Sequence, residues 1–71
     1  MKYVGVKKVL KSAKNEKLQL VYIADDAEAH ITKELMQICK DKNIEIKHVN
    51  TMAELGKIAG IDVGTSAMAE L

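Results

Sequence analysis

Apolar residues recur along this chain with two spacings, one typical of helices and one typical of strands. From Gly5 onward they follow the i, i+3, i+4, i+7 stripe of an amphipathic helix, at Val6, Val9, Leu10 and Ala13. Residues 18–24 read Leu-Gln-Leu-Val-Tyr-Ile-Ala, a nearly continuous apolar run rich in β-branched and aromatic side chains. Such a run predicts a short buried strand. Residues 2–4 predict a brief strand before the first helix.

The middle of the chain predicts a second helix and a third strand. A helix over residues 28–42 would place one apolar stripe inward, at Ile31, Leu35, Ile38 and Cys39. Asp25 and Asp26 supply the cap-type side chains expected before its start, and Asn43 suits its C-terminal cap. Residues 44–49 alternate partway between apolar and polar side chains, as in a strand with one exposed face.

The last third predicts a short helix and a final strand. Asn50 or Thr51 can cap a helix over residues 52–59, which Gly60 would end. Its expected inward side chains are Met52, Leu55 and Ile58. A loop then leads to a strand near residues 66–69. Strands alternating with helices predict an α/β fold with helices on both faces of a sheet. Parallel strands are expected, but spacing leaves the direction of the last one open.

Length and composition narrow the class of protein. The chain has 71 residues, so we expect a single domain covering residues 1–71. Its one cysteine, Cys39, excludes an intramolecular disulfide and suits a buried position in a reducing compartment. No apolar run approaches the ~20 residues of a membrane span. We therefore expect a cytoplasmic monomer that works without a membrane.

Charge is unevenly distributed along the chain. Residues 1–17 hold six lysines against one acid, a net +5, whereas residues 18–71 hold five lysines against nine acids, a net −4. A basic end on an acidic body is typical of a protein that presents one face to a polyanion. Charge alone fits a solvated helix face equally well.

Signals for catalysis or metal binding are weak in this sequence. The glycines form no phosphate-binding loop, and neither His30 nor His48 has a metal-ligand partner at helical spacing. The Asp25–Asp26 pair could be read as paired catalytic carboxylates, but acids between a strand and a helix are more often caps. We therefore predict that the protein is not an enzyme and needs no cofactor or metal.

The first helix carries the most informative pattern. With its apolar stripe turned inward, Lys7, Lys11 and Lys14 follow one another along the outside, with Lys8 beside them. No acid precedes Glu16, so these ammonium groups repel one another unless an anionic partner relieves them. The positive end of the helix dipole next to Gly5 favours phosphate. Only two aromatic residues are present, which favours a shaped, helical RNA over a single strand.

Three segments resemble the ribosomal protein 7Ae/30e family, especially its short bacterial members, and together they span nearly the whole chain. The first, Gly5-Val6-Lys7-Lys8-Val9-Leu10-Lys11, is similar to the family's RNA-binding motif Gly-x-Asn-Glu-x-x-Lys. The others are Val21-Tyr22-Ile23-Ala24-Asp25-Asp26-Ala27-Glu28 followed by Cys39-Lys40-Asp41-Lys42-Asn43-Ile44, and Leu55-Gly56-Lys57-Ile58-Ala59-Gly60-Ile61.

The resemblance implies a fold and a partner. The fold would be a three-layer α/β/α sandwich around a four-stranded mixed sheet, with the last strand antiparallel. The partner would be a kink-turn, a sharply bent RNA with tandem sheared G·A pairs next to a bulge, in a ribosomal or a regulatory RNA. The protein would stabilise the bent conformer.

The resemblance also assigns roles to residues. Gly5 would allow close approach of the RNA, Lys7 and Lys8 would take the Asn and Glu places, and Lys11 would be the motif lysine. Lys14 would extend this RNA-binding face. Glu28 falls where the family contacts the nucleotide extruded at the bend. The loop Ile61-Asp62-Val63-Gly64 corresponds to an apolar loop that packs on the bulged strand.

Two departures from the family pattern matter. Lysines replace both the Asn and the Glu of the motif, and Ala29 stands where the family commonly has proline. Guanine recognition would then use lysine donors on guanine acceptor atoms.

Two other functions stay open at this point. One is a protein-interaction module that binds an acidic partner through the same lysines. The other is an enzyme or small-ligand binder that uses Asp25, Asp26 and Glu28 at the strand ends.

Overall fold

The computed structural model describes residues 2–70 and confirms the predicted order of helices and strands. The elements are β1 (Lys2–Val4), α1 (Val6–Asn15), β2 (Leu20–Ala24), α2 (Ala29–Lys42), β3 (Glu45–Val49), α3 (Met52–Ala59) and β4 (Ala67–Glu70). Met1 and Leu71, the ends of the predicted domain, lie outside the described residues.

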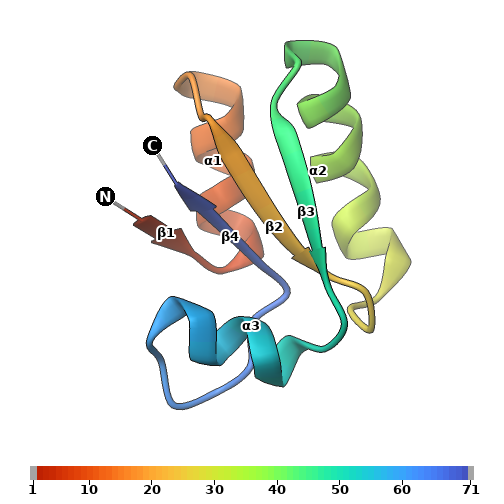
Figure 1. Ribbon diagram of the computed structural model, residues 1–71. Helices are drawn as coiled ribbons and strands as arrows, with labels where there is room; N and C mark the ends of the chain where they lie inside the picture. The colour runs from red at the N-terminus through yellow and green to blue at the C-terminus, as the bar shows by residue number, and fades with distance from the viewer. Residues whose placement is uncertain (1, 71) are drawn as a thin grey trace.

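The four strands form one mixed sheet in the order β1-β4-β2-β3 (Figure 1). β2 and β3 pair in parallel, whereas β4 lies between β1 and β2 and pairs antiparallel with both. The fold that the family resemblance implied, with an antiparallel last strand, is therefore confirmed. Because β4 alone is reversed, the carboxyl ends of β1, β2 and β3 and the start of β4 share one edge of the sheet.

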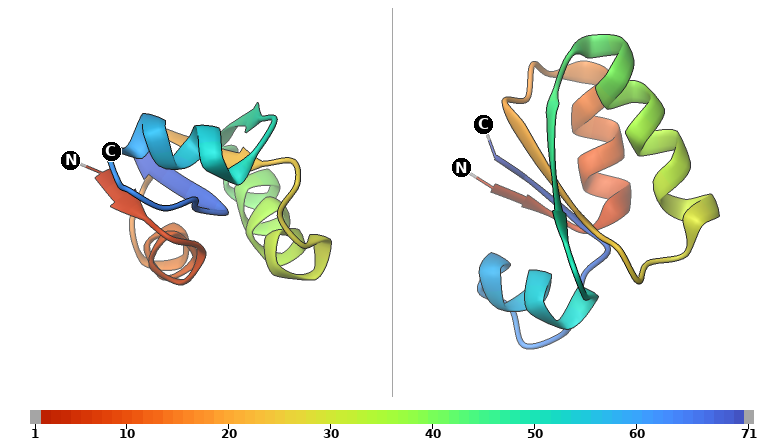
Figure 2. Two further views of the ribbon diagram at one scale, coloured as in Figure 1. Left: turned by 90° about the horizontal axis from the view of Figure 1, so that it is seen from below. Right: turned by 45° about the vertical axis from the view of Figure 1, so that its right-hand side comes forward.

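The helices cover both faces of this sheet, as an α/β/α sandwich requires (Figure 2). α1 and α2 pack side by side on one face, where they bury Val21 and Ile23 of β2. α3 covers the other face, where Leu55 packs with Ala24 of β2 and Met68 of β4. Alternate residues of a strand point to opposite faces, so one short strand contributes to both cores.

Three local caps lie where the sequence predicts them. The Thr51 hydroxyl accepts a hydrogen bond from the Glu54 amide at 3.1 Å and begins α3. Asn43 ends α2 in the left-handed conformation at φ 57°, and Gly60 ends α3 at φ 79°. Each cap depends on one side chain or on one backbone conformation, which is why sequence reasoning finds it.

The prediction that Asp25 and Asp26 cap α2 is wrong. Glu28 occupies the N-cap position of α2 and makes no side-chain cap bond. The Asp26 carboxylate instead accepts from the amide of Met52, at 2.7 Å, and so helps to cap α3. Asp25 lies 2.9 Å from the Nδ1 atom of His48 on β3. Both acids join neighbouring segments at the strand ends, a tertiary role that sequence spacing does not reveal.

The prediction that Ile58 faces the core is also wrong, because 46% of its surface is exposed. The inward side of α3 passes through Leu55 and Gly56, both buried. At Gly56 an added Cβ would collide with the carbonyl oxygen of Val63. This contact turns a glycine inward and an isoleucine outward, the reverse of what side-chain hydropathy indicates.

Backbone hydrogen bonds hold together the edge of the sheet where the helices begin. The Gly5 amide donates to the carbonyl of Ala67 at 3.0 Å, and the Ala24 amide donates to the carbonyl of Ser66 at 3.0 Å. The Asp25 amide donates to the carbonyl of Val49 at 2.7 Å. These bonds hold the segments that lead into α1 and α2 and the loop before β4 in fixed positions relative to one another.

Candidate nucleic-acid interface

Gly5 makes a sharp backbone turn between β1 and α1. Its φ of 101° and ψ of 139° lie in a region that only glycine adopts at low cost. A Cβ added there would meet no protein atom within 4 Å. The space in front of Gly5 is therefore open, and the backbone conformation, not packing, requires glycine.

The first turn of α1 has free hydrogen-bond donors. No side chain of residues 2–70 caps it, its first turn holds no acid, and the first helical bond runs from the Val9 amide to the Gly5 carbonyl at 3.0 Å. The amides of Val6, Lys7 and Lys8 precede that bond and point out of the helix end. Together with the helix dipole they form a site suited to an anion.

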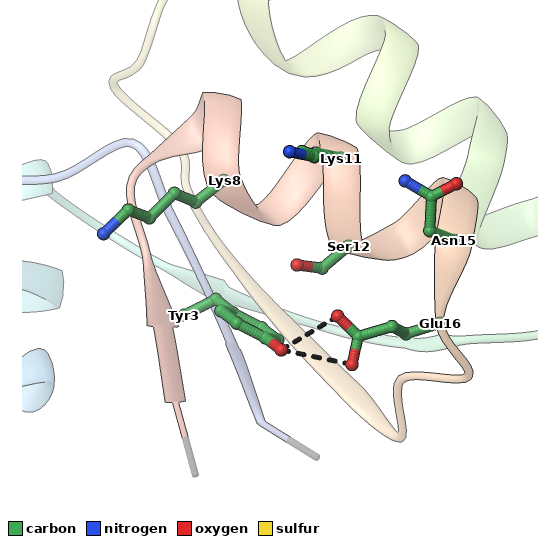
Figure 3. A pocket seen from close by; sticks show the side chains of 6 residues that line it. All are labelled: Tyr3, Lys8, Lys11, Ser12, Asn15 and Glu16. Atoms are coloured by element: carbon green, nitrogen blue, oxygen red, sulfur yellow. Dashed lines mark hydrogen bonds between the residues drawn. The ribbon is translucent and has the colours of Figure 1, made fainter.

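Three exposed lysines surround this helix start. Lys7, Lys8 and Lys11 make no ion pair within residues 2–70. Lys7 lies on the side facing α2, over a groove that Val6 and Leu10 share with α2. Lys8 and Lys11 lie on the side facing β1 (Figure 3). The three ammonium groups thus spread across the outer face of the first two turns.

Lys14 lies in a different environment from the other three lysines. Its ammonium is 3.1 Å from the carboxylate of Glu34 on α2, and both side chains are about half exposed. The sequence stripe correctly places Lys14 on the outside of α1, but it does not reveal an acid contributed by another helix. Since an exposed pair of this kind contributes only about 0–1 kcal/mol, Lys14 can exchange partners readily.

The C-terminal end of α1 is closed by a lysine that sequence reasoning missed. The Nζ atom of Lys42, at the end of α2, donates to the carbonyls of Ala13 at 2.7 Å and Lys14 at 2.8 Å. These carbonyls belong to the last turn of α1, where helix carbonyls lack intrahelical partners and favour a cation. Lys42 is separated from these residues by 29 and 28 positions, which leaves no local signal in the sequence.

Glu28 lies at the start of α2, on the same edge of the sheet as Gly5. Its carboxylate is exposed and lies 3.2 Å from the Nε2 atom of His30. His30 and Ile31 line the groove beneath Lys7, which brings the start of α2 next to the start of α1. Glu28 is therefore positioned beside the lysine cluster, although no ion pair joins it to a lysine within residues 2–70.

The loop of residues 61–64 lies before β4, on the α3 side of the same edge. The Thr65 amide donates to the Met52 carbonyl at 3.1 Å, and a Cβ at Gly64 would lie 3.1–3.2 Å from Met52 atoms. Val63 is 70% exposed and Asp62 is exposed, whereas Ile61 is half-buried. The candidate residues thus follow the sheet edge, with the lysines at one side and this loop at the other.

Tyr3 and Glu16 form a contact that sequence reasoning did not find. The Tyr3 hydroxyl donates to the two carboxylate oxygens of Glu16, at 2.8 and 3.1 Å (Figure 3). This hydrogen bond, with desolvation and the carboxylate charge adding to it, raises the pKa of the Tyr3 phenol. Glu16 is thereby turned toward β1, and it pairs with none of the lysines of α1 within residues 2–70.

Other chemistry receives no support from the part of the chain that the structure describes. Residues 2–70 contain no group of three or more His, Cys, Asp and Glu side chains placed to hold a metal ion. Over the same residues, no helix has the length and apolar character needed to cross a membrane. Cys39 is fully buried, as predicted, and burial raises the pKa of its thiol.

The chain matches one known protein family over almost its whole length. The model of the Ribosomal protein L7Ae/L30e/S12e/Gadd45 family matches residues 3–71. The chain belongs to this family. The resemblance carried by the three sequence segments is thereby confirmed.

Individual family members are similar over almost the whole chain. A protein of Caldanaerobacter subterraneus named RNA-binding protein is 46% identical over 68 residues, which cover 96% of this chain and 83% of that protein. A protein of Halalkalibacterium halodurans with the same kind of name is 38% identical over 66 residues, covering 93% and 80%. A solved structure of a Bacillus halodurans protein of unknown function superimposes with a TM-score of 0.83 at 26% identity, covering 96% of this chain and 68% of that one.

Proposed function

We propose that this protein binds RNA, that it recognises kink-turns, and that it acts in the cytoplasm as a ribosome-associated protein without catalytic activity. Family membership and the relatives named RNA-binding proteins support the RNA partner. The start of α1 supports the mode of binding.

One observation carries the proposal: the first two turns of α1 combine open donors with unpaired cations. The amides of Val6 to Lys8 face outward, and the side chains of Lys7, Lys8 and Lys11 spread on both sides of them. Phosphate oxygens can bind the amides while the ammonium groups neutralise neighbouring phosphates. The missing side chain at Gly5 lets the RNA backbone come within contact distance.

The lysines at the motif positions also give a means of reading guanine. The G·A pairs of a kink-turn expose the N7 and O6 acceptors of guanine, and an ammonium can donate to both. Lys7 and Lys8 would make these contacts, and Lys11 and Lys14 would bind the flanking phosphates. A lysine is less directional than an amide or a guanidinium. We therefore expect strong preference for the bent shape and weaker preference for individual bases.

Glu28 and the loop 61–64 would hold the two arms of the bend. Glu28 accepts hydrogen bonds from the extruded nucleotide at the start of α2. Val63, exposed for 70% of its surface, supplies an apolar contact to the bulged strand. Glu28 precedes α2 and Val63 precedes β4, so together with the lysines of α1 they offer three separate contact points at this end of the sheet.

Binding of this kind stabilises the bent RNA by population shift. Free RNA exchanges between extended and bent forms, and the protein favours the bent form by as much as it binds that form more tightly. Moving an RNA from 1% to 99% bent requires about 10⁴-fold tighter binding of the bent form. Contacts at three separate points of the bend can supply such a difference, because the extended form loses at least one of them.

The test is a titration with two RNAs. One contains tandem G·A pairs beside a three-nucleotide bulge, and the other has the same length and is fully paired. Donor and acceptor dyes on the two arms report bending. We expect tight binding and an increase in energy transfer for the first RNA only. Equal weak binding to both would contradict the proposal and favour an acidic protein as the partner of the lysine face.

A further inference from the structure

A pocket of about 400 Å³ lies between β1 and the outer side of α1, next to the proposed RNA surface (Figure 3). Its lining comes from two elements: Tyr3 of β1, and Lys8, Lys11, Ser12, Asn15 and Glu16 along and just after α1. A volume of this size is within the range of about 300–1,000 Å³ typical of small-ligand sites. Lys8 and Lys11 belong to the proposed RNA surface, whereas the other residues of the pocket have no role in it.

The pocket has opposite charges at its two ends. Lys8 and Lys11 bring two ammonium groups that have no acidic partner within residues 2–70. Glu16 brings a carboxylate whose oxygens accept from the Tyr3 hydroxyl. An ionised carboxylate has about four acceptor positions, so Tyr3 leaves part of its capacity free.

We propose that this pocket binds one unpaired guanosine nucleotide of the bound RNA. Its phosphate lies at Lys8 and Lys11, and its base lies against the Tyr3 ring with its donor edge on Glu16. The inference rests on the proposed function, because Lys8 and Lys11 belong to both surfaces and bring the RNA to the mouth of the pocket.

The pairing of charges selects this class of ligand. A simple anion is attracted by the lysines but repelled by Glu16. A simple cation is attracted by Glu16 but repelled by the lysines. A nucleotide carries an anion at one end and hydrogen-bond donors at the other. Guanine alone among the four RNA bases places two adjacent donors, N1–H and N2–H, on its Watson–Crick edge, where a carboxylate can accept both. Unpaired bases also stack on aromatic side chains.

The bond between Tyr3 and Glu16 prepares the acceptor before the nucleotide arrives. The phenol holds the carboxylate in place from across the pocket, with Tyr3 fixed by the pairing of β1 with β4. A phenol is protonated at neutral pH, so the Tyr3 hydroxyl is available there as a donor to Glu16. A fixed acceptor loses less side-chain entropy when it binds the base.

The first test uses free nucleotides as probes. Amide spectra of ¹⁵N-labelled protein are recorded during titration with guanosine 5′-monophosphate, uridine 5′-monophosphate or inorganic phosphate. We expect guanosine monophosphate to shift the Tyr3, Ser12 and Glu16 amides with about fivefold to tenfold higher affinity than uridine monophosphate. Identical shifts from phosphate alone would reduce the pocket to an anion patch and overturn the inference, as would no shift at all.

The second test asks whether the nucleotide comes from the RNA. Kinked RNAs are prepared with three unpaired guanosines or three uridines added at each free end in turn. We expect one guanosine-ended RNA to bind about fivefold more tightly than its uridine counterpart. The variant Glu16→Gln should abolish this preference, whereas the matched variant Glu45→Gln, on the far edge strand β3, should retain it.

The outcomes separate the two proposals. If kinked RNAs bind tightly with no difference between guanosine, uridine and blunt ends, this inference fails and the proposed function stands. If free guanosine monophosphate binds but no RNA shows the preference, the pocket takes a free nucleotide, and the assignment to RNA is wrong. If kinked and straight RNAs bind alike, the proposed function itself fails.

Discussion

The two ends of α1 differ in whether the protein supplies partners for their charged side chains and free backbone groups. At the C-terminal end, Lys42 donates to the free carbonyls, Lys14 pairs with Glu34, and Glu16 accepts from Tyr3. At the N-terminal end no side chain caps the helix, and Lys7, Lys8 and Lys11 have no acidic partner within residues 2–70.

This difference separates a structural end of the helix from a binding end. The protein supplies its own partners where α1 meets α2 and β1, so the C-terminal end contributes to stability, while Tyr3 leaves part of the acceptor capacity of Glu16 to the ligand proposed above. Nothing in the described chain relieves the repulsion between the cations at the N-terminal end, and a bound polyanion would do so. Changes at the N-terminal end should therefore lower RNA affinity without loss of stability, and changes at the C-terminal end should lower stability with little loss of RNA affinity.

The largest expected effect is on RNA affinity, from changing Lys7, Lys8 and Lys11 together to Gln. Affinity for a kinked RNA should fall by about a hundredfold or more, since three phosphate or base contacts are lost. The slope of log affinity against log salt should become shallower by about 1 for each of these lysines that contacts a phosphate. The unfolding free energy should stay the same or rise, because like charges are removed. Fluorescence titration and urea unfolding measure the two quantities, and a large loss of stability would contradict the account.

The next effect is on stability, from Lys42→Met at the other end of α1. Losing the ammonium that bonds the Ala13 and Lys14 carbonyls should cost about 1–2 kcal/mol of unfolding free energy. RNA affinity should change less than twofold, because Lys42 lies away from the binding end. Lys40→Met, on the same helix with the same charge change, is the control and should remain near wild-type stability. Equal effects of the two variants in urea unfolding would show that the cap contributes nothing.

A smaller effect compares two lysines on one helix face, one unpaired and one paired. Lys11→Gln should weaken binding of a kinked RNA by about tenfold, whereas Lys14→Gln should weaken it by less than about threefold. The reason is that Lys14 must leave Glu34 to bind a phosphate, so its net contribution is reduced. Calorimetry at one fixed salt concentration gives both values. Equal losses of RNA affinity in Lys11→Gln and Lys14→Gln would contradict the expected difference between the unpaired and the paired lysine.

The smallest expected effect is a pH dependence at Tyr3. Its pKa lies above the usual 10.0, so the folded state binds the phenolic proton more tightly than the unfolded state does. The resulting stabilisation is complete below the unfolded pKa and is lost as the pH rises through the folded pKa. Glu16→Gln should lower the Tyr3 pKa in a tyrosinate absorbance titration, and Glu45→Gln should leave it unchanged. An unchanged pKa in Glu16→Gln would show that the Tyr3–Glu16 bond is not formed.

Local features of this fold could be predicted from the sequence, and features that join distant segments could not. Thr51, Asn43 and Gly60 end or begin helices through their own conformation or side chain, and all three were found. Asp26 caps a helix that begins 26 residues later, and the sequence alone suggested the wrong helix. Ile58 faces outward because Gly56 makes the close contact instead, which hydropathy does not show.

The candidate site likewise combines features that the sequence predicts locally with features that depend on contacts between distant segments. The lysine stripe of α1 follows from helical spacing, and the structure leaves Lys7, Lys8 and Lys11 exposed on the first two turns. Their assignment to RNA stays a prediction. The pairing of Lys14 with Glu34 and the Tyr3–Glu16 pocket both depend on which elements pack next to α1. Packing of this kind needs the strand order β1-β4-β2-β3, which spacing leaves undetermined.

The most direct test of the account maps which lysines the RNA covers. Wild-type protein, alone and saturated with the kinked RNA, is treated briefly with an acetylating reagent, and the modification of each lysine is measured by mass spectrometry. We expect strong protection of Lys7, Lys8 and Lys11, with Lys40 and Lys47 as reactive as in the free protein. Protection spread evenly over all these lysines, or confined to Lys40 and Lys47, would contradict the assignment of the binding end of α1.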